Sequence, residues 1–128
     1  MVVFVQFSDL EDTDFVDVVN NARPAYVIDL RLVPRFDTGS LNRRLAFELF
    51  EKVQATYIDA TAPLMGGAHR DVALQRLTDL LRSGKVDMLR PIVFLLATEE
   101  STIASDSDIL SLLSDAGRKA AEVLSFPH

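Results

Sequence analysis

The chain of 128 residues contains no cysteine, and its histidines are His69 and His128 alone. Without cysteine there can be no disulfide, no thiolate nucleophile and no cysteine-ligated metal. Two histidines are too few for a multi-histidine metal centre, so we expect no metal site. No apolar run approaches the ~20 residues that a membrane span needs, and the N-terminus lacks the flanks of a signal peptide. We therefore expect a cytoplasmic protein with no membrane partner.

Positive charge and the familiar cofactor motifs are also scarce. The chain has 13 Lys and Arg residues against 19 Asp and Glu, a formal net charge of −6. This balance disfavours nucleic acid as a partner, because binding it needs a positive surface. There is no Gly-x-Gly-x-x-Gly, no Gly-x-x-x-x-Gly-Lys-Ser/Thr and no Gly-x-Ser-x-Gly. Dinucleotide binding, P-loop chemistry and an α/β-hydrolase elbow are therefore disfavoured, and we expect no cofactor.

The sequence does contain a regular alternation of strand-like and helix-like segments. The β-rich apolar runs are residues 2–7, 26–32, 55–60 and 92–97, and each is followed by apolar residues at helical spacing. The second helix is expected to begin at Ser40 as N-cap, and the last to run from near Ser105 through Val123 and Leu124. We predict a single α/β domain over residues 1–128. Its expected architecture is a three-layer α/β/α Rossmann-like fold with a four-stranded, mainly parallel sheet.

Asp29 and Arg31 lie near the end of the second predicted strand, which is otherwise apolar on consecutive positions. That pattern is typical of a central strand buried on both faces. Side chains alternate along a strand, so Asp29 and Arg31 fall on the same side. One interpretation is a ligand site, in which the guanidinium binds an anion through two parallel hydrogen bonds. The alternative is a structural ion pair that ties the strand end to its loop.

Basic residues gather just beyond this strand. Arg35, Arg43 and Arg44 flank the start of the second predicted helix. The free N–H groups and dipole of a helix N-terminus favour an anion, whereas cations in the first turn oppose that dipole. Asn42 offers a further donor to a phosphate or carboxylate bound there. The alternative is that Arg43 and Arg44 lie on the solvated face of an amphipathic helix.

In an open parallel sheet, ligands bind outside the carboxyl ends of the strands. Polar residues follow every predicted strand, so we expect them to line one pocket. The candidate ligand-binding residues are Asp29, Arg31, Arg35, Asn42, Arg43, Tyr57, Asp59 and Arg70.

Three residues are candidates for catalysis. Asp29 or Glu99 would act as a general base, and His69, beside the Gly66-Gly67 pair, as an acid. The alternatives are a solvated carboxylate for Glu99 and a plain turn for the glycine pair.

Several short motifs share their order with a known family. They are Val27-Ile28-Asp29-Leu30-Arg31, Pro34-Arg35, Leu41-Asn42, Tyr57-Ile58, Gly66-Gly67 and Leu95-Leu96-Ala97-Thr98-Glu99. Over residues 15–100 the chain thereby resembles the bacterial family called domain of unknown function 488. The resemblance implies a small Rossmann-like domain of unsettled activity.

The chain departs from that family after the fourth predicted strand. Family members commonly carry Cys-x-Glu and then Cys-His-Arg there. This chain has Ala97-Thr98-Glu99 and then Ser101-Thr102-Ile103-Ala104. The resemblance therefore implies a diverged member that has lost any thiol or His-Arg role at these positions.

Three functional hypotheses remain. The first is a binding domain that holds a small, phosphate-bearing anion through Arg31, Arg35 and Arg43, with Asp29 orienting Arg31. The second is a hydrolytic or nucleotide-related enzyme. The third is an interaction module that uses an exposed helix face or sheet edge, with a homodimer as one form of it.

Overall fold

Strands and helices alternate along the chain in a computed structural model that describes residues 1–7, 11–32, 34–37, 39–60, 70–82, 90–98, 102–115 and 122–126. The strands are β1 Val2–Gln6, β2 Tyr26–Asp29, β3 Thr56–Asp59, β4 Ile92–Leu96 and β5 Val123–Phe126. The helices are α1 Asp12–Ala22, α2 Arg43–Lys52, α3 Arg70–Arg82 and α4 Asp106–Asp115. None of these helices is long and apolar enough to cross a membrane.

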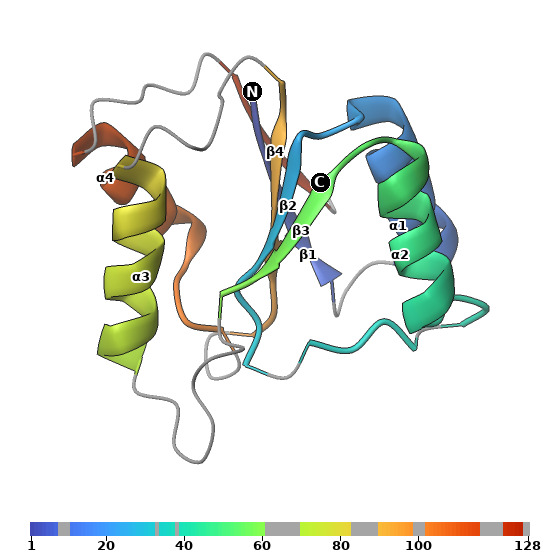
Figure 1. Ribbon diagram of the computed structural model, residues 1–128, viewed down its shortest axis with the longest axis horizontal. Helices are drawn as coiled ribbons and strands as arrows, with labels where there is room; N and C mark the ends of the chain where they lie inside the picture. Colours follow the sequence, from blue (N-terminus) through green and yellow to red (C-terminus); the bar gives the residue numbers. More distant parts are fainter. Residues whose placement is uncertain are drawn as a thin grey trace.

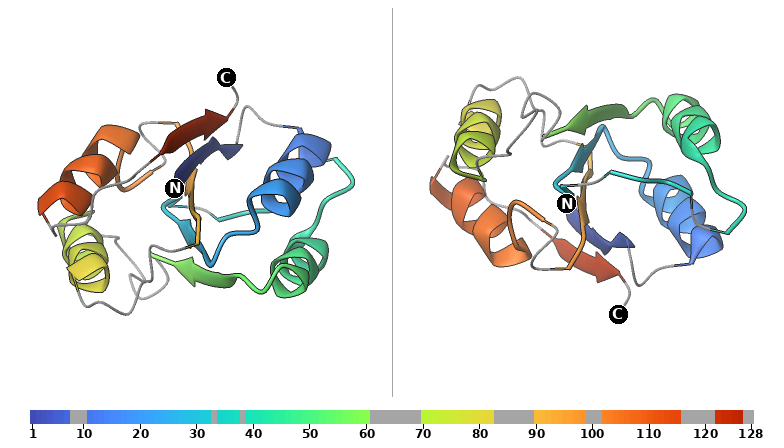
Figure 2. Two further views of the ribbon diagram at one scale, coloured as in Figure 1. Left: turned by 90° about the horizontal axis from the view of Figure 1, so that it is seen from above. Right: turned by 90° about the horizontal axis from the view of Figure 1, so that it is seen from below.

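The five strands form one parallel sheet in the order β3-β2-β4-β1-β5. Helices α1 and α2 cover one face and α3 and α4 the other, which gives three layers (Figures 1 and 2). The predicted α/β class and Rossmann-like architecture are confirmed. Parallel strands need crossover connections, which is why a helix lies between successive strands.

The predicted strand count is wrong by one edge strand. Val123 and Leu124 were expected to continue the last helix, but they belong to β5, which pairs in parallel with β1. The burial of β5 alternates between exposed and half-buried side chains, as a strand at the edge of a sheet allows. Because Val and Leu at these positions also fit helical spacing, the pattern alone did not separate the two structures.

Side-chain alternation along the strands creates two cores. Residues such as Val5, Val27 and Leu95 pack toward α1 and α2. Their neighbours in sequence, such as Phe4 and Ile28, pack toward α3 and α4. All of β4 is buried, as expected for a strand in the middle of the sheet. Asp29 has the same parity as Val27 and therefore lies on the α1/α2 side.

Arg90 closes the amino-terminal edge of the sheet. Its Nη2 donates to the carbonyl oxygens of Arg23, Pro24 and Val53 at 3.1, 3.1 and 3.0 Å. These carbonyls lie just beyond α1 and α2, where the negative ends of the helix dipoles favour a cation. Helix α1 ends before Arg23 and Pro24, with Arg23 in the left-handed conformation at φ 47°, because the residue before a proline avoids the helical region.

Candidate functional site

The candidate site lies at the carboxyl edge of the sheet, near the end of β2. Strand β2 ends at Asp29, earlier than predicted, and Arg31 then forms an isolated antiparallel bridge with Thr102. The chain leaves β1 and β2 toward the α1/α2 layer, whereas β4, which lies between them, is followed by α4 on the other face (Figure 1). This change of side is the position at which parallel α/β sheets usually bind ligands.

Asp29 and Arg31 form a buried bidentate ion pair. Asp29 is fully buried and Arg31 is 4% exposed. Arg31 Nε donates to Asp29 Oδ1 at 2.8 Å, and Nη2 donates to Oδ2 at 2.7 Å. The backbone N–H of Arg31 also donates to Oδ1 at 3.1 Å, and the Tyr57 hydroxyl donates to Oδ2 at 2.6 Å. Four accepted hydrogen bonds occupy all the lone-pair positions of the carboxylate, which disfavours Asp29 as a general base.

The guanidinium of Arg31 is enclosed as well. Its carbon Cζ lies 4.4 Å from the ring centroid of Phe7 and 4.9 Å from that of Phe36. Aromatic faces stabilise a desolvated guanidinium, while the edges of the group remain free to donate hydrogen bonds. Nη1 donates to the carbonyl oxygen of Arg35 at 2.7 Å. The structure therefore favours the structural interpretation, in which Arg31 ties the strand end to the loop beyond it.

Phe36 is the centre of a group of rings that we call the aromatic cluster. Its members are Phe7, Phe15, Phe36, Phe47, Phe50 and Tyr57. The Phe36 centroid lies 5.7 to 6.3 Å from the centroids of the other five. Phe36 is not among the candidate residues that the sequence indicates, so this role was missed. A phenylalanine directly after Arg35, in a segment otherwise typical of a turn, was the signal that it packs inward.

Tyr57 connects the aromatic cluster to the ion pair. Its ring stacks on Phe50 with centroids 5.7 Å apart and an interplanar angle of 6°. Burial raises the pKa of the Tyr57 hydroxyl far above its usual value. The negative charge of Asp29, the hydrogen bond to it and the charge of Asp59 raise this pKa further, while Arg31 acts in the opposite direction. The hydroxyl is therefore a fixed donor to Asp29.

Asp59 lies directly beside this network. Strands β2 and β3 pair in a register that places Asp59 opposite Asp29, and register partners point to the same face of a sheet. Asp59 is only partly buried, unlike Asp29. At this end of the sheet, Asp29 is buried and paired with Arg31, and Asp59 lies nearer the surface.

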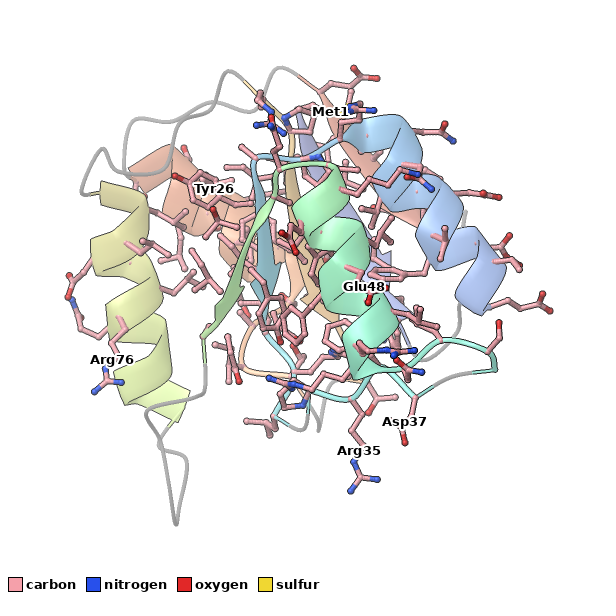
Figure 3. The ribbon with its side chains drawn as sticks, turned by 45° about the vertical axis from the view of Figure 1, so that its right-hand side comes forward. Met1, Tyr26, Arg35, Asp37, Glu48 and Arg76 are labelled. Carbon is pink, nitrogen blue, oxygen red and sulfur yellow. The ribbon has the colours of Figure 1, made fainter. Side chains whose placement is uncertain are left out.

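The exposed cations lie in the first turn of α2 and in the loop that precedes it. Asn42, and not Ser40 as predicted, is the N-cap of this helix, and its Oδ1 accepts from Leu45 N at 2.9 Å. Arg35, Arg43 and Arg44 are all exposed. Figure 3 shows Arg35 pointing away from the body of the molecule. The Cζ of Arg43 lies 4.7 Å from the Phe47 centroid.

These three guanidinium groups form no ion pair within the described part of the chain. The first turn of α2 also contains no acidic residue. The cationic group is linked to the buried network through rings, since Arg43 lies over Phe47 and Phe47 contacts Tyr57 at 5.0 Å between centroids. Arg43 thus contacts the aromatic cluster at Phe47, whereas the buried pair contacts it at Phe7, Phe36 and Tyr57.

The remaining candidates lie outside the described residues or are described only in part. His69, Glu99 and the Gly66-Gly67 pair lie outside the described residues, and for Arg70 the structure describes only a place in the first turn of α3. Among the described residues no group of three or more His, Asp or Glu could hold a metal ion.

No family model, no curated protein and no solved structure matches the chain. The fold is thus established by the structure itself. The resemblance to domain of unknown function 488 stays a prediction that depends on the short motifs given above.

Proposed function

We propose that this domain binds a small anionic, phosphate-bearing ligand at the carboxyl edge of the sheet. Arg35 and Arg43 contact the anion, and Arg44 adds to the local positive potential. Asp29 and Arg31 do not contact the anion but position the site, because Arg31 donates a hydrogen bond to the backbone carbonyl of Arg35 and Asp29 orients Arg31. Asn42, Tyr57 and Asp59 line or support the same region.

One observation carries this proposal. Arg43 and Arg44 are exposed in the first turn of α2 and Arg35 is exposed in the loop before it, without a carboxylate partner in the described part of the chain, although acids outnumber bases overall. Cations there oppose the helix dipole by about 0.3 to 1 kcal/mol each at the surface. A bound anion would reverse that cost, since it interacts favourably with the helix N-terminus and with the arginines.

A titration with inorganic phosphate and with pyrophosphate tests the proposal. Ligand that binds only the folded state raises the melting temperature by mass action, so we expect a saturable rise. Arg35→Gln and Arg43→Gln each remove charge-assisted hydrogen bonds and should raise the Kd about tenfold or more. Chloride at matched ionic strength is the control for a general salt effect.

Arg76→Gln is the matched control variant. Arg76 is exposed on α3, on the other side of the sheet from α2 (Figure 3). Arg76→Gln removes the same charge as Arg35→Gln or Arg43→Gln. Because Arg76 lies on the other side of the sheet from the proposed site, this variant should leave phosphate affinity unchanged. Equal weakening by Arg76→Gln, or a melting shift that chloride reproduces, would show that the response is non-specific and would refute the proposal.

The alternative of a hydrolytic or nucleotide-related enzyme now depends on Glu99 and His69. Asp29 has its lone pairs occupied, and Tyr57 is held as a donor. We therefore keep ligand binding as the proposed function.

A further inference from the structure

Arg43 and Arg44 are adjacent in α2 but have different neighbours on the helix surface. Residues four apart on a helix lie next to each other, which places Phe47 beside Arg43. The Arg43 Cζ lies over the Phe47 ring, 4.7 Å from its centroid. Arg44 has Glu48 at the same spacing, so its neighbour is a carboxylate and not a ring. The aromatic support at the start of α2 therefore belongs to Arg43.

Phe47 is itself held by three other rings of the aromatic cluster. Its centroid lies 5.0 Å from that of Tyr57, 5.8 Å from that of Phe50 and 5.9 Å from that of Phe36. All three contacts are edge-to-face, an arrangement that the charge distribution of aromatic rings favours. Phe47 is only half-buried, so its ring is fixed by the core and still reaches the surface on which Arg43 lies.

The aromatic cluster thus supports two guanidinium groups, and they differ in their pairing. Arg31 lies over Phe7 and Phe36, and its Nε and Nη2 donate to Asp29. Arg43 is exposed and forms no ion pair within the residues that the structure describes. A guanidinium presents its N–H donors in a rigid plane, which matches two oxygens of a carboxylate or a phosphate. Arg43 resembles Arg31 in its aromatic support, and it differs in having no carboxylate partner in the described part of the chain.

We propose that Phe47 positions Arg43 to bind the ligand through two parallel hydrogen bonds, so that the site selects an oxyanion with two coplanar oxygens, such as a terminal phosphate. This inference rests on the proposed function, and it makes Arg43 the principal contact of that site. An arginine loses rotamer freedom when it binds a ligand, and a ring that already restrains the guanidinium reduces this loss. The ring covers a face of the guanidinium and leaves the edges, where the donors lie, to the anion.

Isothermal titration calorimetry of the full chain with inorganic phosphate and with pyrophosphate tests the role of Phe47. Phe47→Leu keeps an apolar side chain but removes the ring face. It should raise the Kd about threefold, as expected for the loss of a cation–π contact at an exposed site. Phe47→Tyr keeps the ring face and should bind as the wild type does. Phe94→Leu is the matched control, because it removes a buried ring from the opposite face of the sheet and should leave the Kd unchanged.

Two further variants separate geometry from charge and from folding. Arg43→Lys keeps the positive charge but loses the planar group of donors, so it should also raise the Kd at least about threefold. In the Arg43→Gln background, Phe47→Leu should have no further effect on the Kd, because the ring acts on the anion through Arg43. A purely structural role of Phe47 would give the same factor in both backgrounds.

These measurements distinguish failure of the anion site from failure of the role of Phe47. A wild-type chain that binds neither phosphate nor pyrophosphate would refute the anion site, and with it any positioning of Arg43. If the wild type binds and Arg43→Gln weakens binding, the anion site stands. In that case the role of Phe47 is refuted by an unchanged Kd for Phe47→Leu or by equal effects of Phe47→Leu and Phe94→Leu. Wild-type affinity in Arg43→Lys would refute the two-bond contact.

Discussion

The two faces of the sheet are packed by different kinds of side chain. Under α1 and α2 the core contains the aromatic cluster and the buried ion pair. Under α3 and α4 it is largely aliphatic, with Phe4 and Phe94 stacked on each other at 5.6 Å and Tyr26 half-buried at its margin. The difference follows from the charge. A guanidinium taken out of water needs a carboxylate at its edge and ring faces above and below, which aliphatic side chains do not supply.

A buried polar group beside the aliphatic core, the hydroxyl of Thr102, is neutral. Thr102 is buried, and its Oγ1 lies 3.1 Å from the carbonyl oxygen of Leu30 and 3.2 Å from that of Ala104. Two backbone carbonyl oxygens satisfy this hydroxyl, so it needs no charged partner and no aromatic rings around it. The core under α1 and α2 therefore surrounds a buried ion pair, whereas the core under α3 and α4 is formed mainly by aliphatic side chains.

Among the predicted changes, replacing the buried cation Arg31 should lower the free energy of unfolding most. Arg31→Met keeps an unbranched apolar side chain between Phe7 and Phe36 but leaves Asp29 buried without its partner. Breaking a buried pair in this way costs about 3 to 5 kcal/mol, so we expect a loss of that size in the free energy of unfolding. Urea denaturation at neutral pH measures it.

The control for this prediction is the double variant Asp29→Asn with Arg31→Met. Because it no longer buries an unpaired charge, its loss of stability should be clearly smaller than the sum of the two single losses. Losses that simply add, or a loss below about 1 kcal/mol for Arg31→Met, would show that the pair is not an energetic unit.

A second prediction compares one ring on each face. Phe36→Leu loses five ring contacts and one face of the Arg31 sandwich, whereas Phe94→Leu loses a single stacked partner. Ring pairs are worth about 0.5 to 1.5 kcal/mol beyond their buried area, so we expect about 3 kcal/mol for Phe36→Leu and about 1 kcal/mol for Phe94→Leu. The unfolding midpoints of the two variants in urea provide the test. Equal losses would mean that both cores respond only to volume.

Much of the fold could be predicted from the sequence because strand and helix periods differ. The consecutive apolar residues within 26–32 and 92–97 indicated two strands, which the structure places at 26–29 and 92–96. Strand β5 could not be separated from a helix, because Val123 and Leu124 satisfy both periods and their pairing with β1 is a long-range contact.

The candidate site was predictable in composition but not in geometry. The alternation of side chains along a strand placed Asp29 and Arg31 on one side of the chain. This alternation does not indicate whether the two side chains contact a ligand or each other. That outcome depends on Phe7 and Phe36, which lie in separate segments and meet only after folding. The N-cap of α2 shifted from Ser40 to Asn42 for a local reason, since both residue types cap helices well.

The smallest expected loss of stability follows removal of a single atom, the hydroxyl oxygen of Tyr57. Tyr57→Phe keeps the ring that stacks on Phe50 and removes only the hydroxyl that donates to Asp29. At neutral pH we expect a loss of about 1.5 kcal/mol, the lower end of the range for a hydrogen bond to a charged group, because the donor Tyr57 is only partly buried.

The same variant carries a pH signature that a merely structural ring would lack. The folded pKa of Tyr57 is raised above its unfolded value of 10.0, so above that pH the unfolded chain releases a proton that the folded chain keeps. The stability that Tyr57 contributes is therefore complete below about pH 10 and falls above it by up to about 1.4 kcal/mol per pH unit. Tyr57→Phe should lose stability less steeply than the wild type in this range, as urea unfolding at several alkaline pH values would show. If both proteins have the same slope, the hydroxyl is not held by Asp29, and the ion pair ends at Arg31 without reaching the aromatic cluster through Tyr57.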